Sequence, residues 1–337
     1  MTNTCGNNIK TQIIWWYGIT FSLVFAMICL GGATRLTHAG LSIVEWKPIA
    51  GIIPPLNHQD WLAEFLKYQT SPEFKLINTD MILSDFKFIY WMEFCHRLLG
   101  RLMGLFFIVP LVFLWRQLLP CVKKMSLTIL MLGALQGVMG WYMVKSGLKD
   151  IPAVSPYRLT AHLFLAFILL GYLSIGILRV GGIKRVAHPK AKLIHITALM
   201  ITLTIFYGGL VAGLKAGLIY NTFPLMGGQL IPGEFLSESP FWLNFFTNHA
   251  TVQWMHRTLA LLSCFHVFLF YIKDNGFYAT AWLSIAILQV ILGIATLIHQ
   301  VPIGLGVLHQ GVGALLFSWS VVMIYKYKTD SKVRNAS

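Results

Sequence analysis

Apolar stretches of about 20 residues recur eight times along the chain, and this feature constrains the fold more than any other. A helix of that length crosses the roughly 30 Å hydrocarbon core of a bilayer. With 56% hydrophobic and 11% charged residues and a mean hydropathy of +0.68, the chain is more apolar than a soluble domain. We predict an all-α integral membrane protein with eight transmembrane helices, at 13–33, 89–115, 126–145, 158–179, 193–214, 250–272, 277–298 and 304–326.

Lysine and arginine gather in alternate loops, which the positive-inside rule assigns to the cytoplasm together with both termini. These residues are Lys10, Arg116, Lys123, Lys124, Arg179, Lys184, Arg185, Lys190, Lys192, Lys273, Lys326, Lys328, Lys332 and Arg334. This pattern and attraction to anionic lipid explain much of the net charge of +14, so no nucleic-acid partner is expected. Few polar residues precede the first apolar stretch, and we expect no signal or transit peptide and a location in a bacterial inner membrane.

The chain resembles itself in two halves. The sequence "EFCHRLLGRL" at 93–102 matches "QWMHRTLALL" at 253–262, "GGATRLTHAGL" at 31–41 matches "GGLVAGLKAGL" at 208–218, and "LQGVMG" at 135–140 matches "LQVILG" at 288–293. We therefore predict a four-helix half over 1–180 and another over 190–337. Because each half has an even number of spans, the repeat is expected to be parallel, about an axis along the membrane normal.

Four of the eleven histidines occupy matching positions in this repeat: His96 and His162 in the first half, His256 and His309 in the second. A lone histidine on an apolar helix is more often a satisfied core residue. Two per half, on separate helices and near the same end, is instead the pattern that places two imidazoles on opposite faces of a haem iron. We predict two such sites, in which His96 and His162 bind one iron and His256 and His309 bind the other. Zinc is less favoured because no third ligand recurs, and copper or an electron relay stays open.

Charged residues next to these histidines differ between the halves. Arg97 and Arg257 follow the histidines at equivalent positions and suit haem propionates, although reaching the membrane surface is an equal alternative. Glu93 precedes His96 by three residues, on the same helix face, whereas its counterpart is Gln253. A carboxylate can take up a proton or stabilise a cation and an amide cannot, so we predict that Glu93 is catalytic and that the chemistry belongs to the first half. The simpler alternative is a local ion pair between Glu93 and Arg97.

The first outer loop is unusually long, at about 55 residues over 34–88, and rich in aromatic residues and proline. We expect it to be folded and to act as a lid over the first site.

Four stretches together resemble the haem A synthase family, in its proteobacterial and mitochondrial branch: "GGATRLTHAGLSIVEWKPIAGIIPP" at 31–55, "EFCHRLLGRLMG" at 93–104, "NTFPLMGGQLIPG" at 221–233 and "QWMHR" at 253–257. The resemblance implies an oxidoreductase that oxidises the C8 methyl group of haem O to a formyl group, giving haem A for aa3-type cytochrome oxidase. It implies that His96 and His162 hold the substrate haem and that His256 and His309 hold a haem b.

The resemblance also implies that Glu93 stabilises a carbocation or deprotonates water. Other members carry an outer-loop cysteine pair that this sequence lacks, so a mechanism requiring those cysteines does not apply. Haem O synthase, oxidase assembly factors and an electron acceptor of unidentified nature are the partners to consider, beside the lipid bilayer.

The main alternative is a bis-histidine di-haem cytochrome that passes electrons from quinol and modifies nothing. For such a carrier, Glu93→Gln would leave the haem composition unchanged. A transporter is less favoured, because its polar groups would lie near the bilayer centre rather than near the outer surface.

Overall fold

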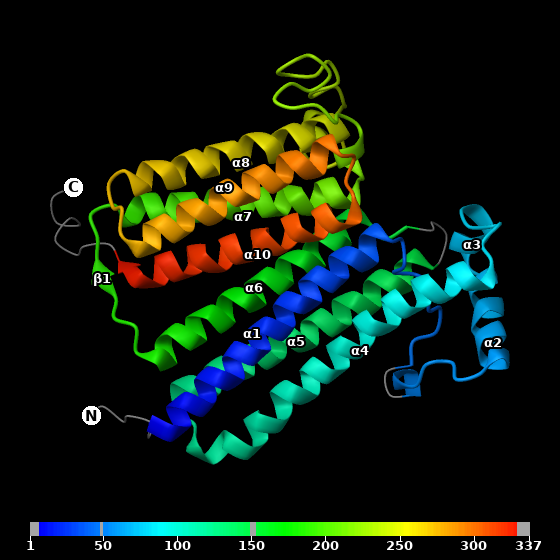
Figure 1. The fold of residues 1–337 in the computed structure, drawn as a ribbon, viewed down its shortest axis with the longest axis horizontal. Coiled ribbons are helices and arrows are strands. Elements are labelled where there is room, and N and C mark those ends of the chain that lie inside the picture. The colour runs from blue at the N-terminus through cyan, green and yellow to red at the C-terminus, as the bar shows by residue number, and fades with distance from the viewer. Residues whose placement is uncertain (1–6, 48–49, 149–152, 329–337) are drawn as a thin grey trace.

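The computed structural model describes residues 7–47, 50–148 and 153–328. Lys332 and Arg334, which we predicted to be cytoplasmic, lie outside the described residues. Long helices lie side by side in a bundle (Figure 1): α1 (Asn7–Leu36), α4 (Leu83–Leu114), α5 (Pro120–Gly147), α6 (Pro156–Gly181), α7 (Ala191–Gly213), α8 (His249–Tyr271), α9 (Phe277–Ile298) and α10 (Ile303–Lys326). The shorter elements are α2 (His58–Gln69), α3 (Pro72–Leu76), β1 (Val186–Ala187), β2 (Tyr327–Lys328) and 3-10 turns at Ala50–Ile52, Trp115–Gln117, Ala216–Leu218 and Phe241–Phe245.

Seven of the described helices are long and apolar enough to span a membrane. They are α1, α4 with its following turn, α5, α6, α7, α9 and α10. The stretch predicted at 250–272 is helical, as α8, but α8 is not among the seven. Its three histidines, glutamine and arginine lower its hydropathy. The protein is therefore an all-helical membrane protein, and an eighth span at α8 stays a prediction.

The packing of the long helices follows the order of the chain. In the first half, α1 packs against α4 and α6, and α5 packs against α4 and α6. In the second half, α7 packs against α8 and α10, and α9 packs against α8 and α10. The halves meet through α1 with α10, α6 with α7, and α6 with α10. Consequently α4 and α6 occupy opposite corners of the first half, and α8 and α10 occupy opposite corners of the second.

The two ends of the bundle differ in what they carry (Figure 1). We call the end with residues 37–82 and 214–248 the loop end, and the end where α1 begins and α10 ends the terminal end. At the terminal end, β1 pairs in parallel with β2, with Val186 opposite Tyr327. This pairing ties the connection between the halves to the last helix.

The long loop of the first half is folded, as expected, and its helices pack against the start of α4 (Figure 1). Trp61, Phe65 and Tyr68 on α2 form a buried cluster with Phe86 and Tyr90 on α4. Because α4 has 32 residues, about 48 Å at 1.5 Å per residue, it is longer than the hydrocarbon core. The loop end of α4 therefore supports this α2–α3 hairpin.

A buried carboxyl group lies inside the hairpin. Glu73 is 7% exposed and accepts a hydrogen bond from the Tyr68 hydroxyl at 3.2 Å, and that hydroxyl in turn accepts one from Asn78. Burial raises the pKa of Glu73 to about 7, the Tyr68 hydrogen bond opposes the rise, and the nearby Glu93 adds to it. The folded hairpin therefore holds this proton to a higher pH than the unfolded segment does.

We predict that the hairpin loses local stability as the pH rises from about 4.5 to about 7, and that Glu73→Gln removes this dependence. Hydrogen exchange of residues 58–78, corrected for the intrinsic effect of pH on exchange, measures it. An unchanged pH dependence in the variant would show that Glu73 is not the titrating group.

Candidate functional site

The four histidines of the repeat lie on helices at opposite corners of their halves: His96 on α4, His162 on α6, His256 on α8 and His309 on α10. In the second half the structure brings the pair together, with ring centres 6.3 Å apart and ring planes at 85°. In the first half, the His96 ring lies against Gly31 of α1 and the His162 ring against Gly140 of α5. Both pairs therefore face into their own half of the bundle.

Each of these rings packs against a glycine of the preceding long helix. The glycines are Gly31 for His96, Gly140 for His162, Gly208 for His256 and Gly293 for His309. A Cβ atom added to them would lie 3.2, 3.6, 3.0 and 2.8 Å, respectively, from the nearest ring atom. We call these four residues the seat glycines. They match in pairs in the sequence repeat, and an added Cβ would displace the His309 ring, crowd those of His256 and His96, and touch that of His162.

The second-half pair fits a haem iron. Two imidazoles that each bind a metal through a nitrogen about 2 Å away hold their ring centres roughly 6 Å apart. The observed 6.3 Å agrees with this arrangement. Among the described residues, no group of three or more histidine, cysteine or acidic side chains is placed to share a metal ion. The donor set therefore suits a metal that brings its own equatorial ligands, as haem does.

A hydrogen bond distinguishes His256 from His96. Nδ1 of His256 lies 2.9 Å from the carbonyl oxygen of Thr204, on the turn of α7 that precedes Gly208. Since a carbonyl only accepts, Nδ1 carries the proton and Nε2 is free for a metal. The His96 ring makes no hydrogen bond to the described residues. Nδ1 of His162 and of His309 is buried without a described partner.

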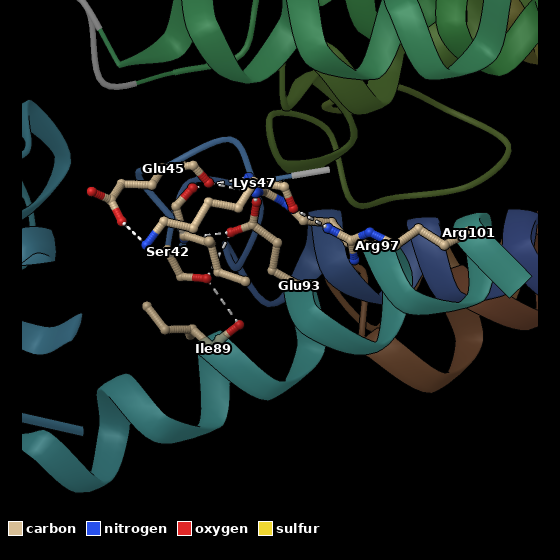
Figure 2. A network of polar contacts seen from close by, with 8 residues as sticks. Ser42, Glu45, Lys47, Ile89, Glu93, Arg97 and Arg101 are labelled. Carbon is tan, nitrogen blue, oxygen red and sulfur yellow. Dashed lines mark hydrogen bonds and ion pairs between the residues drawn. The ribbon is translucent and has the colours of Figure 1, made fainter. Parts of the chain in front are cut away.

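Glu93 lies at the centre of a polar network on the first-half loop (Figure 2). One carboxylate oxygen accepts from the Ser42 hydroxyl at 2.7 Å and from the Ile43 amide at 2.8 Å. The other forms an ion pair with Arg97 at 2.6 Å. Only 3% of Glu93 is exposed. The local pair that the sequence allowed as the simpler alternative is therefore present, and the same carboxylate also holds residues 42 and 43 against α4.

Arg97 uses its remaining contacts in the same way. It donates to the carbonyl oxygens of Ile43 and Glu45 at 2.9 and 3.1 Å. The Glu45 carboxylate pairs in turn with Lys67 of α2 at 3.0 Å. Arg97 thus links α4, the loop and the hairpin.

The second half repeats this clamp without the carboxylate. Arg257 donates to the carbonyl oxygens of Tyr220 and Thr222 at 2.6 and 2.9 Å, which in the repeat are the positions of Ile43 and Glu45. Gln253 donates to the Tyr220 carbonyl at 3.0 Å, and its own amide oxygen is buried without a described partner. An amide at this position therefore supports the clamp, so the clamp alone does not require the charge of Glu93.

Two glycines that follow His96 on α4, and a histidine of the first-half loop, lie outside this arrangement. Gly100 faces Met27 of α1, and Gly104 has open space where a Cβ would be. His38 has a positive φ of 56°, as does Lys215 at the equivalent position of the second half. The sequence reasoning missed the seat glycines, Thr204 and Ser42 as parts of the site. Two of the matched pairs of segments contain the seat glycines, but sequence reasoning assigned these glycines no role beyond supporting the repeat.

Comparison with known proteins gives consistent results. The profile of the family described as "Cytochrome oxidase assembly protein" (COX15-CtaA) matches residues 14–321. Proteins named "Heme A synthase" are similar over nearly the whole chain: one from Nitrosospira multiformis is 43% identical over 327 residues, 92% of each chain. One from Bartonella tribocorum is 42% identical over 332 residues, 93% of this chain and 91% of that one. One from Wolbachia pipientis wMel is 42% identical over 323 residues, 94% and 92%.

The clamp generates a paired prediction. Arg97→Gln is expected to speed amide exchange in residues 42–47 about tenfold to a hundredfold, because charge-assisted hydrogen bonds are lost. Arg257→Gln is expected to do the same in residues 219–223 and to leave 42–47 unchanged. Hydrogen exchange with mass spectrometry measures both, and equal protection of these segments in wild type and variants would contradict the clamp.

Proposed function

The chain belongs to the COX15-CtaA family of cytochrome oxidase assembly proteins, and on that premise we propose that its first half holds a substrate haem and its second half a resident haem b. The protein is a haem A synthase, an oxidoreductase that converts haem O to haem A. Haem O is therefore its substrate. What we infer beyond this is which residues hold each haem and which one takes part in the chemistry.

The hydrogen bond from His256 to the Thr204 carbonyl carries the assignment of the two sites. A ligand whose second nitrogen is already held has a fixed tautomer and ring orientation, which favours a permanently bound metal. His96, whose ring has no such bond among the described residues, is better suited to a haem that must enter and leave. His256 and His309 are accordingly the proposed ligands of haem b, and His96 and His162 those of the substrate.

The seat glycines support both proposed sites. They let each ring lie against the backbone of the neighbouring long helix, so that packing limits the movement of the ring. A haem b bound between His256 and His309 would supply a one-electron redox centre.

Glu93 is the proposed catalytic residue. It lies three residues before His96 on α4, so both point to the same side of the helix. Three donors hold its carboxylate in one position, from Ser42, Ile43 and Arg97. A fixed negative charge there can stabilise positive charge developing at the substrate methyl carbon, or accept a proton from an attacking water. The ion pair with Arg97 supplies the cation that a buried carboxylate requires.

Helix packing supports an arrangement of two related halves with eight spans. Exchanging α1, α4, α5 and α6 with α7, α8, α9 and α10, respectively, turns each contact given above into another of them, except the α6–α10 contact, which is unchanged. We propose on this basis that α8 spans the membrane as its counterpart α4 does. The short connections at the terminal end carry Arg116, Lys184, Arg185, Lys190 and Lys273, and we propose on this basis that this end is cytoplasmic in a bacterial inner membrane. The histidine pairs would then lie toward the periplasmic side.

Glu93→Gln separates chemistry from structure, since Gln253 already serves the clamp of the second half. We predict that the conversion of haem O falls about a hundredfold or more, while amide protection of residues 42–47 is kept. Haem extraction and chromatographic typing, combined with hydrogen exchange, measure the two effects. Undiminished haem A production in the variant would refute a catalytic role for the carboxylate.

Loss of a second-half ligand should affect only one haem. We predict that His256→Ala or His309→Ala removes the haem b absorbance of the purified protein, and that His96→Ala leaves it in place. The 85° angle between the rings further predicts the highly anisotropic low-spin EPR signal given by perpendicular imidazole planes. Full haem b in both second-half variants would show that the ligands are elsewhere.

A further inference from the structure

Two cations at the loop end of the first half are held over aromatic rings. The guanidinium of Arg158, on α6, lies 4.4 Å from the centre of the Tyr142 ring, and Nζ of Lys145 lies 4.9 Å from the centre of the Trp141 ring. Both rings belong to α5. Neither cation forms a salt bridge with a described acidic residue. Their positions are thus fixed by the rings while their charges stay without an acidic partner in the described structure.

Arg158 connects these pairs to the proposed substrate site. Arg158 is four residues before His162, so it lies on the same face of α6, one turn nearer the loop end. Tyr142, the partner of Arg158, lies on α5 beyond Gly140 and therefore also nearer the loop end than the His162 ring. A group bound at His162 and reaching toward the loop end would therefore meet Arg158.

The second half lacks these cation–aromatic pairs. By the repeat, the counterparts of Trp141, Tyr142, Lys145 and Arg158 are Ile294, Ala295, Ile298 and Leu305. All four counterparts are aliphatic. The difference therefore parallels that between Glu93 and Gln253, and marks a property of the first half alone.

We propose that Arg158 and Lys145 bind the two propionate carboxylates of the substrate haem. The inference rests on the proposal that the first half holds haem O. Charge-assisted hydrogen bonds to carboxylates are among the stronger polar contacts in proteins, and an arginine can make two at once. The two cations match the two carboxylates in number and charge. Arg97, which we considered for this role from sequence, is instead engaged by Glu93 and by the carbonyls of Ile43 and Glu45.

A belt of aromatic and basic side chains at the membrane surface is the competing explanation. Two observations weigh against it. α6, which carries Arg158, contacts α1, α5, α7 and α10, so Arg158 starts from a helix within the bundle, although α5, which carries Lys145 and both rings, packs against α4 and α6. α9 and α10 reach the same end of the bundle with aliphatic residues at the equivalent positions, although a belt would be needed there equally.

The test compares haem O with its dimethyl ester, in which both carboxylates are blocked. Each is titrated, with absorbance as the readout, into protein that retains haem b. We expect wild type to bind haem O about tenfold to a hundredfold more tightly than the ester. Arg158→Leu and Lys145→Leu should each reduce this preference, and the double variant should abolish it. Arg158→Lys should keep part of it, and Arg116→Leu, at the terminal end, should keep all of it.

The outcomes distinguish a failure of this inference from a failure of the proposed substrate site on which it rests. Equal affinity of wild type for the acid and the ester, with binding that His162→Ala abolishes, would overturn the role of Arg158 and Lys145 and leave the substrate site intact. Binding that survives His162→Ala would instead contradict the proposed site. Haem b absorbance reports folding in every variant, and the wild-type comparison of acid and ester decides the question even where a variant fails to fold.

Discussion

The close approach of four imidazole rings to four helix backbones is the contact on which the rest of this structure depends. On an apolar helix few polar groups can fix a histidine ring, and among these four only His256 has a hydrogen bond from its side-chain Nδ1 to a described residue, so packing must set the direction of the others. The seat glycines provide that packing, at distances that leave no room for a Cβ beside His309 and almost none beside His256. Each seat glycine lies on the long helix that precedes the histidine's own helix, and its lack of a side chain lets the two helices pack closely. The same four glycines therefore affect both the packing of the helices and the position of the rings.

A shared plan makes the differences between the halves informative. Both halves use an arginine to hold the carbonyls of the loop that precedes its helix, and both place two histidines on opposite corners. Only the first half adds a carboxylate at Glu93, a folded hairpin on α4, and the cations Arg158 and Lys145. Only the second half fixes a ligand through Thr204. These contrasts support one half that receives and changes a haem, and another that keeps one.

Much of the fold could be predicted from the sequence, because hydropathy reports directly on the length of apolar helix. The stretch predicted at 277–298 has the same bounds as α9, and the stretch predicted at 304–326 ends where α10 ends and starts one residue after it. α4 begins at Leu83 rather than at 89, since its first turns lie beyond the apolar region and pack against α2. Hydropathy carries no signal for that extension. The histidines were found because the repeat singles them out.

The remaining parts of the site depend on contacts between residues far apart in the chain. Glu93 meets Ser42 across 51 residues, and His256 meets Thr204 across 52, so no local pattern announces either contact. The seat glycines occur in the matched segments of the repeat, but their contact with the histidine rings can be recognised only in the folded structure. The sequence suggested Arg97 as a propionate ligand, whereas the structure leads us to propose Arg158. The carbonyls that engage Arg97 come from a loop whose path the sequence does not reveal.

The central claim is that the two histidine pairs hold two different haems. A cryo-electron microscopy map of the protein, purified from cells that supply haem O, tests it most directly. The account predicts one haem between His96 and His162 that bears the farnesyl chain, and one without that chain between His256 and His309. A farnesylated haem in the second half, or iron ligated by other residues, would contradict it.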